Sequence, residues 1–87
     1  MVYDVIFSNR ALKEFEYFVK HDKVILNKIL KLIEDIKLHP HTGLGKPEAL
    51  KNNLSGHWSR RITKEHRLVY KIDGDTIVIV ASCRFHY

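Results

Sequence analysis

Apolar and polar residues recur with changing periods along the chain, and these periods predict the order of its secondary structure. Residues 2–7 alternate as a short edge strand does and are rich in β-branched and aromatic side chains. Residues 11–20 place apolar side chains three or four positions apart, which predicts an amphipathic helix with Ser8 as its N-cap. A second helix is expected from the N-cap Asp22 to the stop at Pro40, with a longer apolar stripe: Ile25, Leu26, Ile29, Leu30, Leu32, Ile33 and Ile36.

Turn-forming residues dominate the next segment, from His39 to Ser55. We expect a long loop there, with a helical turn around residues 48–51. Loops of this length in compact domains are commonly functional. Three strand-like runs follow, joined by the turns Lys64-Glu65 and Asp73-Gly74-Asp75, the second of which is a strong hairpin signal: residues 57–63, 66–72 and 76–83.

The order of these elements indicates an α+β fold. The run from Ile77 to Ala81 is apolar on both faces, which predicts an interior strand covered by the helices. One strand, two helices and then a meander of strands give two helices packed on one face of a small, mostly antiparallel sheet. A length of 87 residues provides for one core, so we expect a single domain over residues 1–87.

The charge of the chain favours a polyanionic partner. Fifteen Lys and Arg residues against ten Asp and Glu residues give a formal net charge of +5. Many small domains carry extra lysines for solubility alone, so the position of the charge matters more than its sum. On the second predicted helix, four lysines lie away from the apolar stripe, where they either form a solvated face or meet a phosphate backbone: Lys23, Lys28, Lys31 and Lys37.

The cysteine content and the first residues of the chain indicate its compartment. Cys83 is the only cysteine, which excludes an intramolecular disulfide and agrees with a reducing environment. The apolar start at residues 1–7 is too short to span a bilayer and lacks the basic leader of an export signal. We therefore expect a cytoplasmic protein that does not associate with a membrane.

Two arginines are predicted to lie together on an exposed face of the sheet. Strand alternation separates Arg60 from Arg61, and a neighbouring antiparallel strand brings Arg67 to the face that carries Arg61. Two interpretations are open for this pair. Each arginine either pairs across the strands with a carboxylate such as Glu65 or Asp75, or the two together clamp a phosphate, which matches the guanidinium fork.

A carboxylate and a C-terminal imidazole complete the set of groups that RNA cleavage requires. A base removes the proton from a 2′-hydroxyl, cations stabilise the charge on the attacked phosphate, and an acid protonates the departing 5′-oxygen. Glu48, the arginines and His86 can fill these three roles, and Tyr87 lies beside His86. Such a site requires RNA, because DNA lacks the attacking hydroxyl.

The stretch that contains Glu48 is similar to the signature of a known family. Residues 45–62 read GKPEALKNNLSGHWSRRI, which closely resembles the G-K-P-E-x-L-K-x-N-L-S-G-x-W-S-R-R-I signature of YoeB-type toxins of the RelE superfamily. The sequences EHRLVY at residues 65–70 and CRFHY at residues 83–87 also match, although this family usually has Tyr at the position of Phe85. The resemblance covers almost the full chain, including the order of its elements.

This resemblance implies a function. YoeB-type toxins belong to type II toxin-antitoxin systems, cleave mRNA in the ribosomal A site and are neutralised by a cognate YefM-type antitoxin. The implied partners of this chain are thus that antitoxin and the ribosome with its mRNA, and the implied assembly is a homodimer or a toxin-antitoxin heteromer. The resemblance implies a RelE-like domain and an endoribonuclease, and we expect no cofactor and no metal.

The resemblance also implies a role for each residue that matches the motif. Glu48 is the expected general base, Arg67 the expected stabiliser of the transition-state phosphate, and His86 the expected general acid. The expected supporting residues, which contact RNA or phosphate or orient the substrate, are Lys51, Arg61 and Tyr87.

Three other functions are open from the sequence alone. A toxin of the ParE type shares the architecture and acts on DNA gyrase by binding, although Glu48 and the His86-Tyr87 end argue against it. A general RNA-binding module would use the arginines to bind, with Glu48 and His86 satisfying neighbouring groups. A metal site would use histidines, whose spacing matches no compact ligand pattern: His39, His41, His57, His66 and His86.

Overall fold

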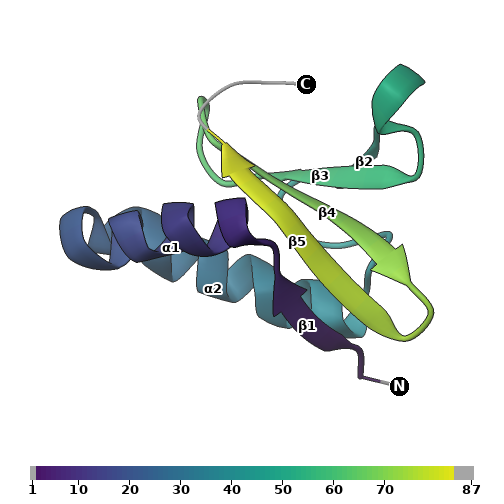
Figure 1. Ribbon diagram of the computed structural model, residues 1–87, viewed down its shortest axis with the longest axis horizontal. Helices are drawn as coiled ribbons and strands as arrows, with labels where there is room; N and C mark the ends of the chain where they lie inside the picture. The colour runs from purple at the N-terminus through teal and green to yellow at the C-terminus, as the bar shows by residue number, and fades with distance from the viewer. Residues whose placement is uncertain (1, 84–87) are drawn as a thin grey trace.

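The computed structural model describes residues 2–83, which form one five-stranded sheet covered on one face by two helices (Figure 1). The strands have the order β1-β5-β4-β3-β2. β1 runs parallel to β5, and every other pair is antiparallel. The predicted α+β class and mostly antiparallel sheet are confirmed. The elements are β1 (Asp4–Phe7), α1 (Asn9–His21), α2 (Lys23–Leu38), β2 (Glu48–Ala49), the 3-10 helix η1 (Asn52–Leu54), β3 (His57–Arg61), β4 (Arg67–Asp73) and β5 (Thr76–Cys83).

Both helices begin at the residues that the sequence predicts as caps. The Ser8 hydroxyl accepts a hydrogen bond from the backbone N–H of Ala11 at 3.1 Å and donates one to the Val80 carbonyl at 2.8 Å. The Asp22 carboxylate accepts from the N–H groups of Val24 and Ile25, both at 3.1 Å. These bonds satisfy helix N–H groups that have no partner within the helix. Ser8 in addition fixes the start of α1 to β5.

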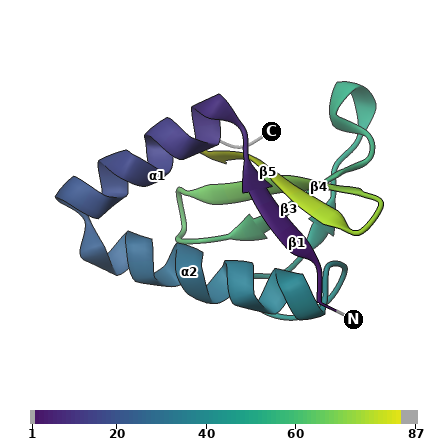
Figure 2. The same ribbon diagram turned by 60° about the horizontal axis from the view of Figure 1, so that its bottom comes forward.

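The core lies between the helices and the sheet, and both helices pack on the same side of the strands (Figure 2). β5 is an interior strand between β1 and β4, as its apolar sequence predicts. The largest of the fully buried apolar side chains come from α2, β4 and β5: Ile29, Ile36, Leu68, Tyr70, Ile77 and Ile79.

The segment between α2 and β3 differs from its prediction. Glu48 lies in the two-residue strand β2 and not in a helical turn; the turn comes later, at η1. The backbone there pairs with β3: Gly45 accepts from the N–H of Arg61 at 2.7 Å, and Leu50 donates to the His57 carbonyl at 2.9 Å. Pairing with an existing strand satisfies these backbone groups, which an isolated helical turn would leave to solvent.

The ends of the last three strands also differ slightly from the predicted limits. β3 ends at Arg61, because the N–H groups of Ile62 and Thr63 both turn to the His66 carbonyl. Asp73 pairs with Thr76 and belongs to β4, which leaves a two-residue turn that starts at Gly74. Gly74 has a φ of +63°, a left-handed conformation that glycine adopts without steric cost.

Candidate active site

The sheet face opposite the helices, called the open face below, carries three of the four predicted site residues within the described chain: Glu48, Arg61 and Arg67. Leu68 and Tyr70 of β4 belong to the core beneath the helices, so Arg67 and Val69 point the other way. Arg61 pairs directly with Arg67 in the register of β3 and β4. The predicted placement of the two arginines on one face is therefore confirmed.

Register also places the candidate base beside these arginines. Glu48 pairs with Ser59, and Ser59 pairs with Val69, so these side chains form one row across the open face. Arg61 and Arg67 form the next row, called the arginine row, two residues further along each strand. Two residues of antiparallel strand span roughly 7 Å. The Glu48 carboxylate thus stands one row away from two guanidinium groups.

The arginine row is a pair of like charges on directly opposite residues, which is unfavourable without an anion. Among residues 2–83, neither arginine forms an ion pair with Glu65, Asp75 or another carboxylate. Of the two interpretations given above, the phosphate clamp is the one that the geometry supports. Guanidinium groups bind phosphate through paired hydrogen bonds, so a phosphate would relieve their mutual repulsion.

Glu48 and Lys51 line a common pocket at the edge of the sheet. The pocket has a volume of about 270 Å³ and is formed by residues 48–54. Both charged residues are exposed, so their charged groups are accessible to a ligand. Lys51 therefore lies in the same pocket as the candidate base, and its contact with RNA stays a prediction.

A small apolar cluster holds this edge against the sheet. Val69 and Ala81 are buried on the open face although the helices lie on the other side, and Leu50 packs against them. Ser59 is also buried, with 7% of its surface exposed. Because Leu50 is only two residues from Glu48, this contact limits how far the backbone at Glu48 can move from the arginine row.

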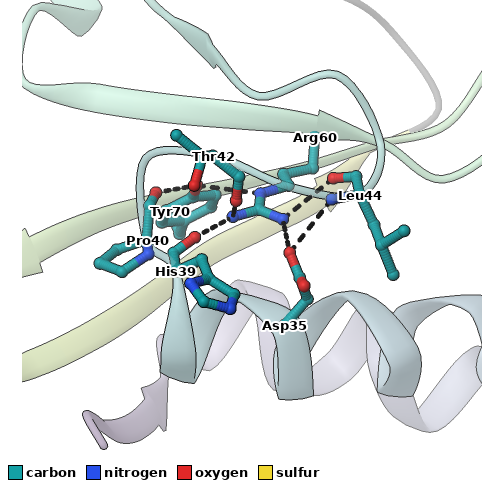
Figure 3. Close-up of polar contacts among 7 residues, drawn as sticks. All are labelled: Asp35, His39, Pro40, Thr42, Leu44, Arg60 and Tyr70. Carbon is teal, nitrogen blue, oxygen red and sulfur yellow. Dashed lines mark hydrogen bonds and ion pairs between the residues drawn. The ribbon is translucent and has the colours of Figure 1, made fainter. Parts of the chain in front are cut away.

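A buried arginine anchors the loop that leads to Glu48, and the sequence reasoning did not assign it a role (Figure 3). Arg60 is fully buried on the helix side of β3 and forms an ion pair with Asp35 of α2. Its Nε donates to the Tyr70 hydroxyl at 3.2 Å, and that hydroxyl donates to the Pro40 carbonyl at 2.6 Å. Its terminal nitrogens also donate to three carbonyls of the loop, those of His39, Thr42 and Leu44.

The network changes the acidity of both of its titratable partners. Burial opposes ionisation of Asp35, but hydrogen bonds from Arg60 and from the Leu44 N–H outweigh it and lower the pKa of the carboxyl below 3.8. Burial raises the pKa of the Tyr70 hydroxyl, and Arg60 offsets only part of that rise. Asp35 is therefore a carboxylate and Tyr70 a neutral phenol across the physiological pH range.

Alternation along β3 is the signal that identifies Arg60. It assigns Arg60 to the face of Trp58 and Ile62, which are core residues, and a charged residue on an apolar face requires a buried partner. Sequence alone did not show that Asp35 is this partner, because the two residues meet only through the packing of α2 on the sheet.

The predicted acid and its neighbour, His86 and Tyr87, lie outside the described residues. β5 pairs with β4 as far as Cys83, which stands opposite Arg67.

Within residues 2–83, no three His, Cys, Asp or Glu side chains gather as a metal ion would require. In the same range, no helix has the length and apolar character needed to cross a membrane.

Comparison with known proteins identifies the family. The family model for the YoeB-like toxin of bacterial type II toxin-antitoxin systems matches residues 7–87. Toxin YoeB of Escherichia coli K12 is 51% identical over 83 residues, covering 95% of this chain and 98% of that protein. The structure of the YoeB dimer from Staphylococcus aureus is 44% identical in sequence, with a TM-score of 0.88. A chain of the heterotetrameric YoeB-YefM complex from the same organism is also 44% identical, with a TM-score of 0.86. Both matches cover 100% of this chain and 100% of the matched chain. This chain therefore belongs to the YoeB-like toxins of bacterial type II toxin-antitoxin systems.

Proposed function

We propose that this toxin is an endoribonuclease that cleaves mRNA in the ribosomal A site and so inhibits translation. The observation that carries the proposal is the position of Glu48 one row from the arginine row on the open face. A carboxylate next to two cations that have no anionic partner among the described residues suits an attack on a phosphodiester. The family membership supports the same activity.

In the proposed reaction, Glu48 takes the proton of a ribose 2′-hydroxyl while the 2′-oxygen forms a bond to the adjacent phosphorus. Negative charge builds on the non-bridging oxygens, where Arg67 stabilises it with support from Arg61. The bond from phosphorus to the 5′-oxygen breaks, and His86 supplies the proton that this oxygen takes up. Lys51 holds the RNA near Glu48, and Tyr87 orients the substrate or His86.

The proposed protein partner is a YefM-type antitoxin. The Staphylococcus aureus relative forms a heterotetramer with YefM and is also found as a dimer. We expect this chain to assemble in the same two ways, and to act in the cytoplasm, where its mRNA substrate is translated. An acidic segment of the antitoxin that covers the arginine row would neutralise the same charges that bind RNA.

Primer extension on mRNA from translating ribosomes tests the proposal. We expect the wild type to produce breaks at defined codons, and we expect Glu48→Gln and His86→Gln to produce none while still binding RNA. Arg67→Ala should lower kcat by about 100-fold, with a smaller change in KM, because the charge on the phosphate grows in the transition state. Cleavage by both acid-base variants at the wild-type rate would refute the assignment. Inhibition of gyrase supercoiling without mRNA cleavage would favour a ParE-type activity.

A further inference from the structure

We infer that His57 and Lys71 form a second phosphate-binding subsite on the open face, on the opposite side of Glu48 from the arginine row. This inference rests on the proposed function and extends it from the reacting phosphate to the flanking RNA. The family signature leaves the position of His57 open, and the matching stretch at residues 65–70 ends before Lys71, so the resemblance assigns no role to either residue.

The register of β3 and β4 carries the geometry. His57 pairs with Lys71, Ser59 with Val69, and Arg61 with Arg67. Since residues two apart on a strand share a face, all three pairs lie on the open face. His57 and Lys71 are four residues from the arginine row, roughly 13 Å away, and the row that contains Glu48 lies midway between them.

Both residues are available to a ligand. Lys71 is exposed, and among the described residues it forms no ion pair, not even with Asp73, the next residue of β4 on the same face. His57 is half-buried, and its Nδ1 is buried without a hydrogen-bond partner within residues 2–83. Nε2 is therefore the ring nitrogen that remains to bind a ligand. A lysine point charge and an imidazole N–H are both suited to phosphate.

The sequence of charges along the strands matches an RNA strand. A nucleic acid backbone alternates anionic phosphates with riboses. The open face has a matching order along its strands: the two cations of the arginine row, then the Glu48 carboxylate, then the His57-Lys71 pair with its lysine cation. Consecutive phosphates of an RNA strand are closer together than these two pairs, so the side chains of the pairs have to lean toward the Glu48 row to hold two phosphates that flank one ribose. The 2′-hydroxyl of that ribose can then donate to the Glu48 carboxylate. Side chains on strands lean along the strand direction, so the long arginine and lysine side chains can reach toward that ribose.

An acidic peptide would make poorer use of the same surface. It can offer carboxylates to both cationic pairs, but it has no requirement for a hydrogen-bond acceptor between them. We therefore assign the subsite to RNA phosphate, and binding of an acidic peptide becomes an outcome of the test.

The experiment measures binding of a fluorescent single-stranded RNA, methylated at its 2′-hydroxyls so that it cannot be cleaved, as a function of salt concentration. Each phosphate contact in a single strand contributes about 0.7 to the slope of log affinity against log salt. Lys71→Ala should make the slope shallower by about 0.7. When the salt concentration rises from about 50 to about 200 mM, the affinity of the wild type should therefore fall by a factor about 2.6 times larger than that of the variant. His57→Phe, which keeps a ring in the half-buried position, should weaken binding by about threefold or more.

The control is Lys13→Ala, which removes the same charge from an exposed position on α1, in the helical layer. It should leave the slope unchanged. If Lys13→Ala lowers the slope as much as Lys71→Ala does, the effect is one of net charge and the inference is wrong. The inference is also wrong if Lys71→Ala binds RNA as the wild type does but loses affinity for a labelled acidic peptide.

A parallel cleavage assay on translating ribosomes separates this inference from the function on which it rests. If the wild-type protein binds RNA through Lys71 but never cleaves mRNA, the proposed function is wrong and the subsite stands. If the wild-type protein cleaves mRNA but Lys71→Ala leaves the salt slope unchanged, the subsite is wrong and the proposed function stands.

Discussion

Arg60 and Arg61 are adjacent in the sequence, and the alternation of a strand gives them opposite environments. Arg60 points into the core, where the Asp35 carboxylate, the Tyr70 hydroxyl and backbone carbonyls accept its hydrogen bonds. Arg61 points to the open face, where it stands opposite Arg67. The buried arginine holds the structure, and the exposed one is available to a substrate.

This difference predicts that substitutions at the two arginines change the free energy of unfolding by very different amounts. Arg60→Met should lower the free energy of unfolding by about 3–5 kcal/mol, because it leaves the Asp35 carboxylate and several loop carbonyls without their donor. Arg61→Ala, the matched control, should change it by less than about 0.5 kcal/mol. Urea unfolding followed by circular dichroism measures both. Equal stability of the two variants would show that the buried network does not anchor the loop.

The acidity of Asp35 gives the same network a pH dependence. The folded pKa lies below the ordinary value of 3.8, so the folded state binds fewer protons than the unfolded state in this range. The stabilisation by Asp35 is complete above pH 3.8 and is lost as the pH falls through the folded pKa. The difference in unfolding free energy between wild type and Asp35→Asn should therefore shrink as the pH is lowered from about 6 to about 2. A difference that grows on acidification would mean that the pKa shift has the opposite sign.

At the scale of elements, the sequence predicts those that have their own periodicity or caps. Ser8 and Asp22 begin the two helices as expected, and the Asp-Gly turn joins β4 to β5. β2 was not predicted, because two residues carry no period and their pairing depends on β3. Its position is set by the preceding loop, which the Arg60 network fixes and which turns sharply at Gly45, where φ is +77°.

Gly45 should be required for both stability and cleavage. A Cβ at this position would lie 2.9 Å from the Arg61 carbonyl oxygen, in a conformation that L-residues rarely adopt. Gly45→Ala should therefore displace the loop, and with it Glu48 and Arg61, lowering the cleavage rate by about 100-fold. Gly56→Ala is the control, because its φ is +90° but a Cβ there meets nothing within 4 Å. Thermal unfolding should show that Gly45→Ala costs at least about 1 kcal/mol more than Gly56→Ala; equal costs would exclude the clash.

At the scale of the molecule, the two faces of the sheet have separate tasks. The helices bury the apolar residues of one face, whereas the open face carries Glu48, the arginine row and the His57-Lys71 pair. The sequence predicted that Arg61 and Arg67 share an exposed face, and the family signature linked them to Glu48. The distance of one row between carboxylate and arginines was not predictable, because it depends on the register of β2 with β3. The position of the candidate acid, His86, stays a prediction.

The whole molecule should be toxic through its chemistry and not through its surface alone. Overproduction of the wild type should arrest growth and protein synthesis unless a cognate antitoxin is co-expressed. Glu48→Gln replaces the carboxylate with an amide of nearly the same shape, which cannot take a proton from a 2′-hydroxyl. The variant should therefore accumulate as folded protein and permit growth at the rate of cells without the toxin. A toxin that acts only by binding gyrase or RNA would keep its surface in this variant and still arrest growth. Measurement of growth, labelled amino-acid incorporation and plasmid supercoiling in the same cultures thus separates the catalytic toxin from both binding alternatives.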